Sequence, residues 1–268
     1  MKKCSLLILC ALLCMMSGCG SSKEENISDV TGKQMLVVGM DCHQQPFAYE
    51  TDKHSEDSVV LGEKYCKGFD VSLARYLAKA LQREISIVDM KSDQMVTALE
   101  EQTIDVAISA LQIQDDDQVD VSSVYYEDAM VILVQKDSKL AKAKKLTDFA
   151  KKKLMAVSGT NADKAIDEIK DVVHESGASD METLQTALKD KKCDAIVVPA
   201  SIAGTIVKKD KNLVMISFEK EGFTTKNQYV IAMEDGLKEE EESLYHEVET
   251  VLAKIETGTK TNWMKENQ

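Results

Sequence analysis

Two segments of the chain share one pattern of hydrophobic and polar positions. Residues 96–108 (VTALEEQTIDVAI) and 185–197 (QTALKDKKCDAIV) each place an Asp six positions after the Leu of Thr-Ala-Leu, and each ends in a short apolar run. This order predicts the end of a helix, a polar turn and a buried strand. Because the unit occurs twice, 89 residues apart, we expect two similar α/β lobes with a binding site in the cleft between them.

Apolar runs and amphipathic segments alternate along the rest of the chain, which predicts an α/β fold with mixed or parallel sheets. The predicted strands cover residues 34–40, 85–90, 126–134, 154–157, 213–218 and 229–233, and the predicted helices cover 69–81, 146–150, 162–174, 201–208 and 237–255. A polar hairpin or insertion is expected over 51–66. Ligands in open α/β sheets bind at the carboxyl ends of strands. The ends that qualify are Asp41, 109–112, 158–161 and 198–199.

The first residues have the layout of a secretory signal peptide. Two lysines precede an apolar run over 5–16, and small residues follow. Residues 16–19 also resemble a bacterial lipoprotein box, in which Cys19 would become the lipidated first residue. We therefore expect a signal peptide over 1–18 and a flexible tether over 19–33. Plain secretion is the alternative to lipidation.

The formal net charge of −13 argues against nucleic acid and anionic lipid as partners of the protein surface. Hydrophobic content of 44% is ordinary for a globular protein. Three cysteines remain after Cys19. Cys42 and Cys66 form a disulfide only if the segment around Pro46 folds back, and spacing alone leaves this open. Cys193 is expected to be a small core residue.

Several motifs, in their order and spacing, resemble the extracellular solute-binding proteins of family 3, which serve amino-acid ABC transporters. The resemblance runs from about residue 34 to Trp263. The motifs are 36–41 (LVVGMD) with 46–47 (PF), 68–73 (GFDVSL), the first repeat, 119–125 (VDVSSVY), 157–160 (VSGT), 194–195 (DA) and 258–263 (GTKTNW).

The resemblance implies a two-lobed periplasmic-binding-protein-like fold of type II. Each lobe is a mixed sheet flanked by helices, and two crossings near 126–128 and 224–228 hinge the lobes. Residues 34–126 with 228–268 would form lobe 1, and 127–227 would form lobe 2. A monomer held by lipid on Cys19 would capture a small solute at the extracellular face of the membrane (or in the periplasm), close, and dock on a permease.

The resemblance also assigns ligand contacts residue by residue. The expected contacts are Asp41, Gln44, Phe47, Ser92, Ser109, Ala110, Gln112, Thr160 and Asn161. The turn after Val157 is expected to offer backbone N–H groups to an anion. No catalytic residue, metal ion or cofactor is expected.

Two positions depart from the family pattern. The Arg that usually grips the ligand α-carboxylate has no counterpart in 112–118 (QIQDDDQ), and the Asp that usually receives the α-ammonium is Pro199. Losing such a charge-assisted contact costs about 1.5–3 kcal/mol. We therefore expect weak binding of free α-amino acids, and a cationic, uncharged or peptide-like solute instead. Asp115–Asp117 would favour a cation if they face the cleft, or form a solvated acidic turn outside it.

Two other classes of function remain open at this stage. An enzyme on the same fold, of dehydratase or lyase type, would draw on Asp41, His43, Glu50 and Asp117. The four histidines show no metal-ligand spacing, although His43 sits beside Asp41. A sensor that binds a ligand without transport is the second alternative, and sequence does not separate it from a transport protein.

Overall fold

The computed structural model describes residues 34–113, 118–218 and 221–268. Most strands belong to one ten-stranded mixed sheet, and a smaller four-stranded sheet lies beside it. The strands are β1 (Met35–Met40), β2 (His43–Gln44), β3 (Ala48–Thr51), β4 (Val59–Leu61), β5 (Lys64–Lys67), β6 (Glu84–Asp89), β7 (Val106–Leu111), β8 (Val119–Val121), β9 (Tyr126–Gln135), β10 (Lys153–Met155), β11 (Val173–His174), β12 (Ala195–Pro199), β13 (Leu213–Ile216) and β14 (Lys226–Glu234).

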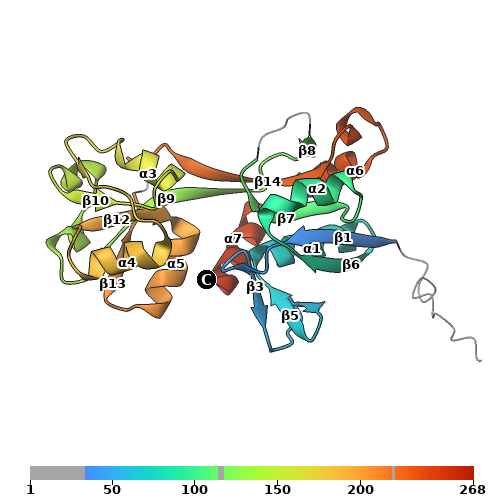
Figure 1. Ribbon diagram of the computed structural model, residues 1–268, viewed down its shortest axis with the longest axis horizontal. Helices are drawn as coiled ribbons and strands as arrows, with labels where there is room; N and C mark the ends of the chain where they lie inside the picture. Colours follow the sequence, from blue (N-terminus) through green and yellow to red (C-terminus); the bar gives the residue numbers. More distant parts are fainter. Residues whose placement is uncertain (1–33, 114–117, 219–220) are drawn as a thin grey trace, which may run out of the picture. The chain divides into compact units, whose positions relative to one another are not determined.

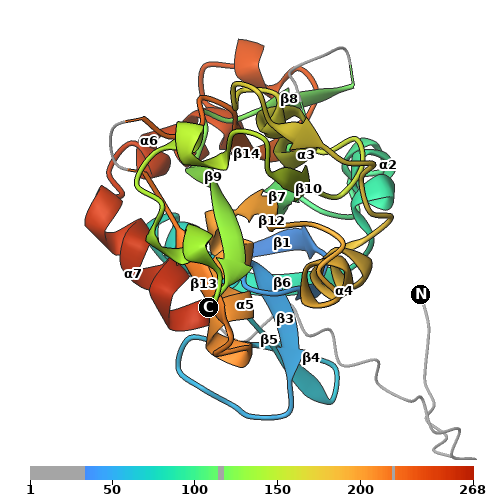
Figure 2. The same cartoon turned by 90° about the vertical axis from the view of Figure 1, so that its left-hand side faces the viewer.

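Helices cover both faces of the large sheet (Figures 1 and 2). They are α1 (Phe69–Ala80), α2 (Met95–Glu100), α3 (Asn161–Ile166), α4 (Met181–Lys189), α5 (Ala200–Lys209), α6 (Leu244–Leu252) and α7 (Thr257–Asn267). Short 3-10 turns are η2 (Ser92–Gln94), η3 (Lys139–Lys142), η4 (Leu146–Phe149) and η5 (Leu237–Glu239). None of these helices is both long and apolar enough to cross a membrane.

Two long antiparallel strands, β9 and β14, connect the two halves of the large sheet and run side by side in Figure 1. Their register pairs Lys226 with Ala129 and Tyr229 with Tyr126. Beyond this overlap β14 pairs with β7 and β8, whereas β9 pairs with β12 and β13. This overlap includes most of the residues predicted as crossings from the sequence, near 126–128 and 224–228.

The Asp of each repeat makes the same reciprocal contact with the start of a neighbouring strand. Asp105 Oδ2 accepts a hydrogen bond from Val37 N at 2.7 Å, and Asp105 N donates to Val37 O at 2.8 Å. In the second copy, Asp194 Oδ2 accepts from Lys153 N at 2.9 Å, and Asp194 N donates to Lys153 O at 2.8 Å. The repeat therefore builds one helix–turn–strand joint twice.

The core follows from alternation along strands that are buried on both faces. On β9, Ile132 and Val134 pack into one cluster with Phe149, whereas Val131 and Leu133 pack into another with Leu184. The other half of the sheet follows the same rule, because β1 and α1 share one cluster and α2 packs in a second cluster on the opposite face. Cys193 is buried in the core, as predicted.

The single helix predicted over 162–174 is wrong. Helix α3 ends at Ile166, and the chain turns at Asp171, whose φ is 58°. Val173 N then donates to Lys152 O at 2.9 Å, which adds β11 to the sheet beside β10. The apolar spacing was misleading because Ile166 and Ile169 are buried in one core although only the first lies in a regular helix.

The long helix predicted over 237–255 is also wrong in its first half. Only the short turn η5 forms at Leu237, and α6 begins at Leu244. Side chains compete with helix hydrogen bonding here: Ser243 Oγ donates to Leu237 O, and Asp120 Oδ2 accepts from Lys238 N at 2.7 Å. The segment 257–267, for which no helix was predicted, forms α7.

Several sequence predictions lie outside the described residues. They are the signal peptide over 1–18, lipidation of Cys19, the tether over 19–33 and the position of Asp115–Asp117. They stay predictions. The predicted hairpin over 51–66 corresponds to the smaller sheet, in which β4 and β5 pair antiparallel.

Candidate functional site

A pocket of about 770 Å³ lies where β7 ends, where β14 begins and beside the turn between β10 and α3. Its polar lining comes from Gln112, Thr160, Asn161, Lys226, Asn227 and Gln228. Its apolar lining comes from Ile113, Val124, Val157, Ala162, Met181, Val197, Val198, Pro199, Ile202 and Val230, with Gly159 between the two kinds of surface. Among these described lining residues there is no carboxylate, and Lys226 is the one charged side chain.

Amide side chains on three segments of the pocket wall are joined by hydrogen bonds. Asn161 Nδ2 donates to Gln112 Oε1 at 3.2 Å and to Asn227 Oδ1 at 3.1 Å. Asn227 Nδ2 in turn donates to Tyr229 Oη at 3.0 Å. Asn161 therefore links the segment after β7, the start of α3 and the strand β14. An amide offers donors and an acceptor without a net charge, so this wall suits polar uncharged groups.

Behind the pocket wall, a buried carboxylate ties β9 to α5. Asp128 Oδ1 accepts from Ser201 N at 3.0 Å, and Oδ2 accepts from the Ser201 hydroxyl and from Tyr229 Oη. Burial raises the pKa of Asp128, although the Ser201 contacts oppose the shift. Burial also raises the pKa of Tyr229, and the neighbouring Asp128 carboxylate adds to that effect. Asp128 is thus used to hold the strand and is not among the lining residues.

Several polar groups of the turn at 157–161 form hydrogen bonds that stabilise the turn itself and the start of α3. Thr160 is the N-cap of α3: its hydroxyl accepts from Asp163 N at 3.3 Å and donates to Val157 O at 2.7 Å. Gly159 N donates to Asp163 Oδ2 at 3.0 Å, and Thr160 N donates to Val157 O at 3.3 Å. Gly159 N and Thr160 N, two of the backbone N–H groups that were expected to receive an anion, are therefore already paired within the turn.

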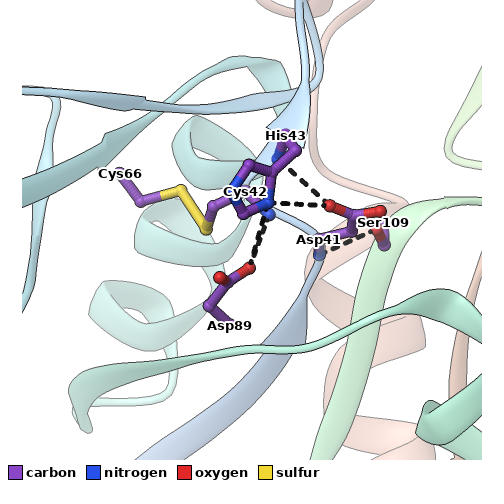
Figure 3. Close-up of a disulfide and its surroundings, with 6 residues drawn as sticks. All are labelled: Asp41, Cys42, His43, Cys66, Asp89 and Ser109. Carbon is purple, nitrogen blue, oxygen red and sulfur yellow. Dashed lines mark hydrogen bonds and ion pairs between the residues drawn. A yellow bond between two sulfur atoms is a disulfide. The ribbon is translucent and has the colours of Figure 1, made fainter.

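A second group of expected ligand contacts gathers at the carboxyl end of β1 (Figure 3). Asp41 N donates to Ser109 Oγ at 3.1 Å, and Gln44 Nε2 donates to Asp41 Oδ2 at 2.8 Å. Asp41 and Ser92 line a separate hollow of about 620 Å³. Cys42 and Cys66 form a disulfide here, which answers the question that spacing left open.

The remaining expected contacts are Phe47, which packs among aromatic rings, and Ala110, which is held through its backbone. The Phe47 ring is buried against Tyr229, with 4.9 Å between ring centroids. Ala110 has a φ of 45°, and its N–H donates to Asp70 Oδ2 at 2.7 Å. Gly68 has a φ of 149°, and a Cβ there would lie 2.0 Å from Phe47 O, so glycine is needed for this close approach.

The structure thus divides the expected ligand contacts into two groups. Gln112, Thr160 and Asn161 line the 770 Å³ pocket, whereas Asp41, Gln44, Phe47, Ser92, Ser109 and Ala110 are not among its described lining residues. Sequence analysis missed Lys226, Asn227 and Gln228. Their only signal was their place in a predicted crossing strand. Pro199, the departure noted from the sequence, does line the pocket.

Three of the four residues considered for enzyme chemistry lie within the described part of the chain. Glu50 lies on β3 and forms an ion pair with Lys64 at 2.6 Å. His43, the first residue of β2, has its Nδ1 atom 3.3 Å from Asp41 Oδ1. Asp117 is outside the described residues.

Comparison with known proteins agrees with the fold. Residues 36–266 match the family model described as bacterial extracellular solute-binding proteins, family 3. The arginine-binding extracellular protein ArtP of Bacillus subtilis is 34% identical over 149 residues, which span 54% of this chain and 53% of that relative. The L-cystine-binding protein TcyJ of Escherichia coli is 28% identical over 211 residues, spanning 78% and 75%.

A solved structure has the same fold. The amino-acid ABC transporter substrate-binding protein AbpA from Streptococcus pneumoniae, bound to L-arginine, superimposes with a TM-score of 0.59 and 24% sequence identity. The match covers 90% of this chain and 97% of that one. The two-lobed α/β architecture therefore extends over nearly all of the described residues.

Proposed function

Because this chain belongs to the bacterial extracellular solute-binding proteins of family 3, we propose that its 770 Å³ pocket captures an amino-acid-type solute for an ABC permease. The chain is a binding component of a transporter and not an enzyme. The observation that carries the proposal is the amide wall of the pocket, in which Asn161 bridges Gln112 and Asn227.

Hinge closure around the solute is part of the proposal. We assign lobe 1 to residues 34–126 with 228–268 and lobe 2 to 127–227, because β9 and β14 overlap only across Tyr126–Ala129 and Lys226–Tyr229. Gln112 lies in lobe 1 of this division and Asn161 in lobe 2. Their hydrogen bond is therefore one that solute binding would strengthen or replace as the lobes move.

The proposed solute is an uncharged or peptide-like relative of an amino acid. Relatives bear names that refer to arginine, cystine and glutamine binding. A free α-ammonium needs an acceptor with negative charge, and the described lining offers Pro199 and amide oxygens instead. Lys226, the one lining cation, is already in an ion pair with Glu127. An amide-rich wall is better matched to a neutral amide or peptide group than to a zwitterionic head group.

Location and partners complete the proposal. The family is extracellular, and we propose that lipid on Cys19 anchors a monomer at the outer face of the cytoplasmic membrane, with 19–33 as a tether that allows it to reach the permease. Lipidation is tested by substituting Cys19→Ser and measuring release of the protein into the medium. A sensing role without transport would leave uptake of the bound solute unchanged when the chain is removed.

Calorimetry of the full chain tests the solute. Free amino acids, N-acetyl amino acids and dipeptides are titrated in turn, and the best binder is then measured with Asn161→Leu and with the control Asn212→Leu, an exposed position outside the pocket lining. We expect Asn161→Leu alone to weaken binding. Sub-micromolar binding of a free amino acid would refute the solute class, whereas equal binding by Asn161→Leu would refute the pocket.

A further inference from the structure

The carboxyl end of β1 carries a cluster of three metal-ligating side chains that lies outside the solute pocket. One ligand atom from each of Asp41, His43 and Asp89 lies within 4.8 Å of the other two. Asp41 follows β1, His43 begins β2, and Asp89 ends β6, the parallel neighbour in which it pairs with Met40. Adjacent parallel strands thus place the three side chains at one edge of the sheet (Figure 3).

Carboxylate oxygens of Asp41 and Asp89 face the same ring nitrogen of His43. His43 Nδ1 is 3.3 Å from Asp41 Oδ1 and 3.8 Å from Asp89 Oδ1. A proton on that nitrogen can point to only one of the two carboxylates. Two ligand atoms that are each about 2.1 Å from a tetrahedral ion lie about 3.4 Å apart, which is close to both measured separations. One ion can therefore contact all three side chains after small side-chain movements.

A second histidine in this chain shows what a simple ion pair looks like. His174 also lies beside two aspartates, but it uses opposite ring nitrogens: Nδ1 is 2.8 Å from Asp167 Oδ1 and Nε2 is 3.0 Å from Asp163 Oδ1. The two carboxylates therefore face different nitrogens, and one ion bound to a single ring nitrogen would not reach both of them. The convergence of two carboxylates on one nitrogen is found at His43 and not at His174.

The segment from Asp41 to Gln44, which carries two of the three side chains, is held in place by covalent and hydrogen bonds. The disulfide between Cys42 and Cys66 anchors the residue between Asp41 and His43. Cys42 N donates to Asp89 Oδ1 at 2.9 Å, and Gln44 Nε2 donates to Asp41 Oδ2 at 2.8 Å. Such outer hydrogen bonds orient carboxylate ligands before an ion arrives. The His43 side chain is 65% exposed, which leaves it open to solvent and to an entering ion.

From this arrangement we propose that Asp41, His43 and Asp89 bind a divalent first-row transition ion. One imidazole and two carboxylates are a mixed nitrogen and oxygen set, which suits Zn²⁺ or Mn²⁺ better than a thiolate-seeking ion. Three protein ligands leave coordination positions for water. Asp93 and Lys91 line the same hollow and contribute opposite charges. No metal site was expected from the sequence, because Asp89 is far from His43 along the chain.

Titration of the full chain with Mn²⁺, followed by the electron paramagnetic resonance signal of the free ion, tests the proposal. Mn²⁺ is chosen because thiols elsewhere in the chain are poor ligands for it. We expect one site in the wild type, and at least about a tenfold loss of affinity in His43→Ala and in Asp89→Asn. Substituting a residue that only hydrogen-bonds to a metal ligand already lowers affinity by about tenfold or more. His174→Ala is the matched control and should bind as the wild type does.

The proposal is wrong if the wild type binds no Mn²⁺, or if His43→Ala binds as tightly as the wild type. It is also wrong if His174→Ala loses as much affinity as His43→Ala, because binding would then follow overall charge. Circular dichroism and a count of free thiols check that each variant keeps its fold and its disulfide. His43→Ala is decisive if Asp89→Asn does not fold, since the His43 imidazole is largely exposed.

Discussion

The Tyr125 hydroxyl donates a hydrogen bond to Asp70 Oδ1 at 2.9 Å, and both side chains are buried. The other carboxylate oxygen accepts from Ala110 N, which holds that residue at positive φ directly before the end of β7. Burial raises the pKa of Asp70 to about 7, although both hydrogen bonds favour the charged form. Asp70 therefore links helix α1, the approach to β9 and the strand end that leads to the pocket.

This pair predicts a pH-dependent stability. Asp70 in the folded chain keeps its proton to about pH 7, whereas the unfolded chain releases it near the ordinary pKa of 3.8. The folded state therefore binds more protons between these values, so this contribution to stability is lost progressively as pH rises from 3.8 to about 7. Compared with Asp70→Asn, the wild type should lose up to about 1.4 kcal/mol per pH unit in that window. Urea unfolding at several pH values measures the difference.

Tyr125→Phe tests the hydrogen bond from Tyr125 to Asp70 separately from the titration of Asp70. It removes the hydroxyl but keeps the ring against Phe69, whose centroid is 6.1 Å away. We expect a loss of about 1.5–3 kcal/mol near neutral pH, because a partly charged acceptor is left without its donor. Stability curves for wild type and Asp70→Asn that run parallel from pH 4 to 7 would contradict the raised pKa.

The repeat explains how much of the fold was predictable. Its Asp residues, Asp105 and Asp194, lie at the same joint in both copies, and each pairs with one residue of a neighbouring strand. Strands buried on both faces leave continuous apolar runs, which is why β1, β7, β9 and β12 were found from the sequence. Gln112, Thr160 and Asn161 followed from the same logic, because they come directly after strand ends.

The parts that were missed depend on contacts between distant residues. Helix α3 stops because Val173 is drawn into the sheet beside β10, and no local signal reports that pairing. Asn227 is joined to the pocket wall by a hydrogen bond from Asn161, which is 66 positions away. In the same way Asp89 meets His43 through parallel pairing of β1 and β6. The periodicity of apolar residues indicates whether a segment is a helix or a strand, but not which distant segment it contacts.

The disulfide should contribute strongly to stability. Cys42 and Cys66 are both buried and close a loop with a sequence separation of 24. Crosslinking a loop of this length stabilises a fold by about 3 kcal/mol through the entropy of the unfolded chain. Urea denaturation of the double variant Cys42→Ala and Cys66→Ala should show a loss of that size, and a reducing agent should affect only the wild type. Cys193→Ala, at a buried free cysteine, controls for lost packing.

Restoring a charge at Pro199 should change the solute that binds. Pro199 lines the pocket and is the N-cap of α5, a position at which Asp is favoured. A carboxylate there would accept an α-ammonium group and strengthen binding by about 1.5–3 kcal/mol. Pro199→Asp should therefore bind free L-amino acids at least about tenfold more tightly than the wild type. Pro199→Asn, which has a similar shape without the charge, should show little gain by calorimetry. Equal gains in both variants would argue against a role for charge.

Thr160 both caps helix α3 and lines the pocket, and comparison with a second helix cap can separate these two roles. Thr160 caps α3 at the pocket, and Asp180 caps α4, where its Oδ1 accepts from Thr183 N at 2.7 Å. Removing either cap should cost about 1 kcal/mol of stability, because a helix N–H loses its partner. Only Thr160 lines the pocket, so Thr160→Ala should also weaken the best solute of the calorimetric screen by about threefold to tenfold. Asp180→Ala should leave solute affinity unchanged. If the two variants lose affinity equally, stability alone accounts for the effect and Thr160 does not contact the solute.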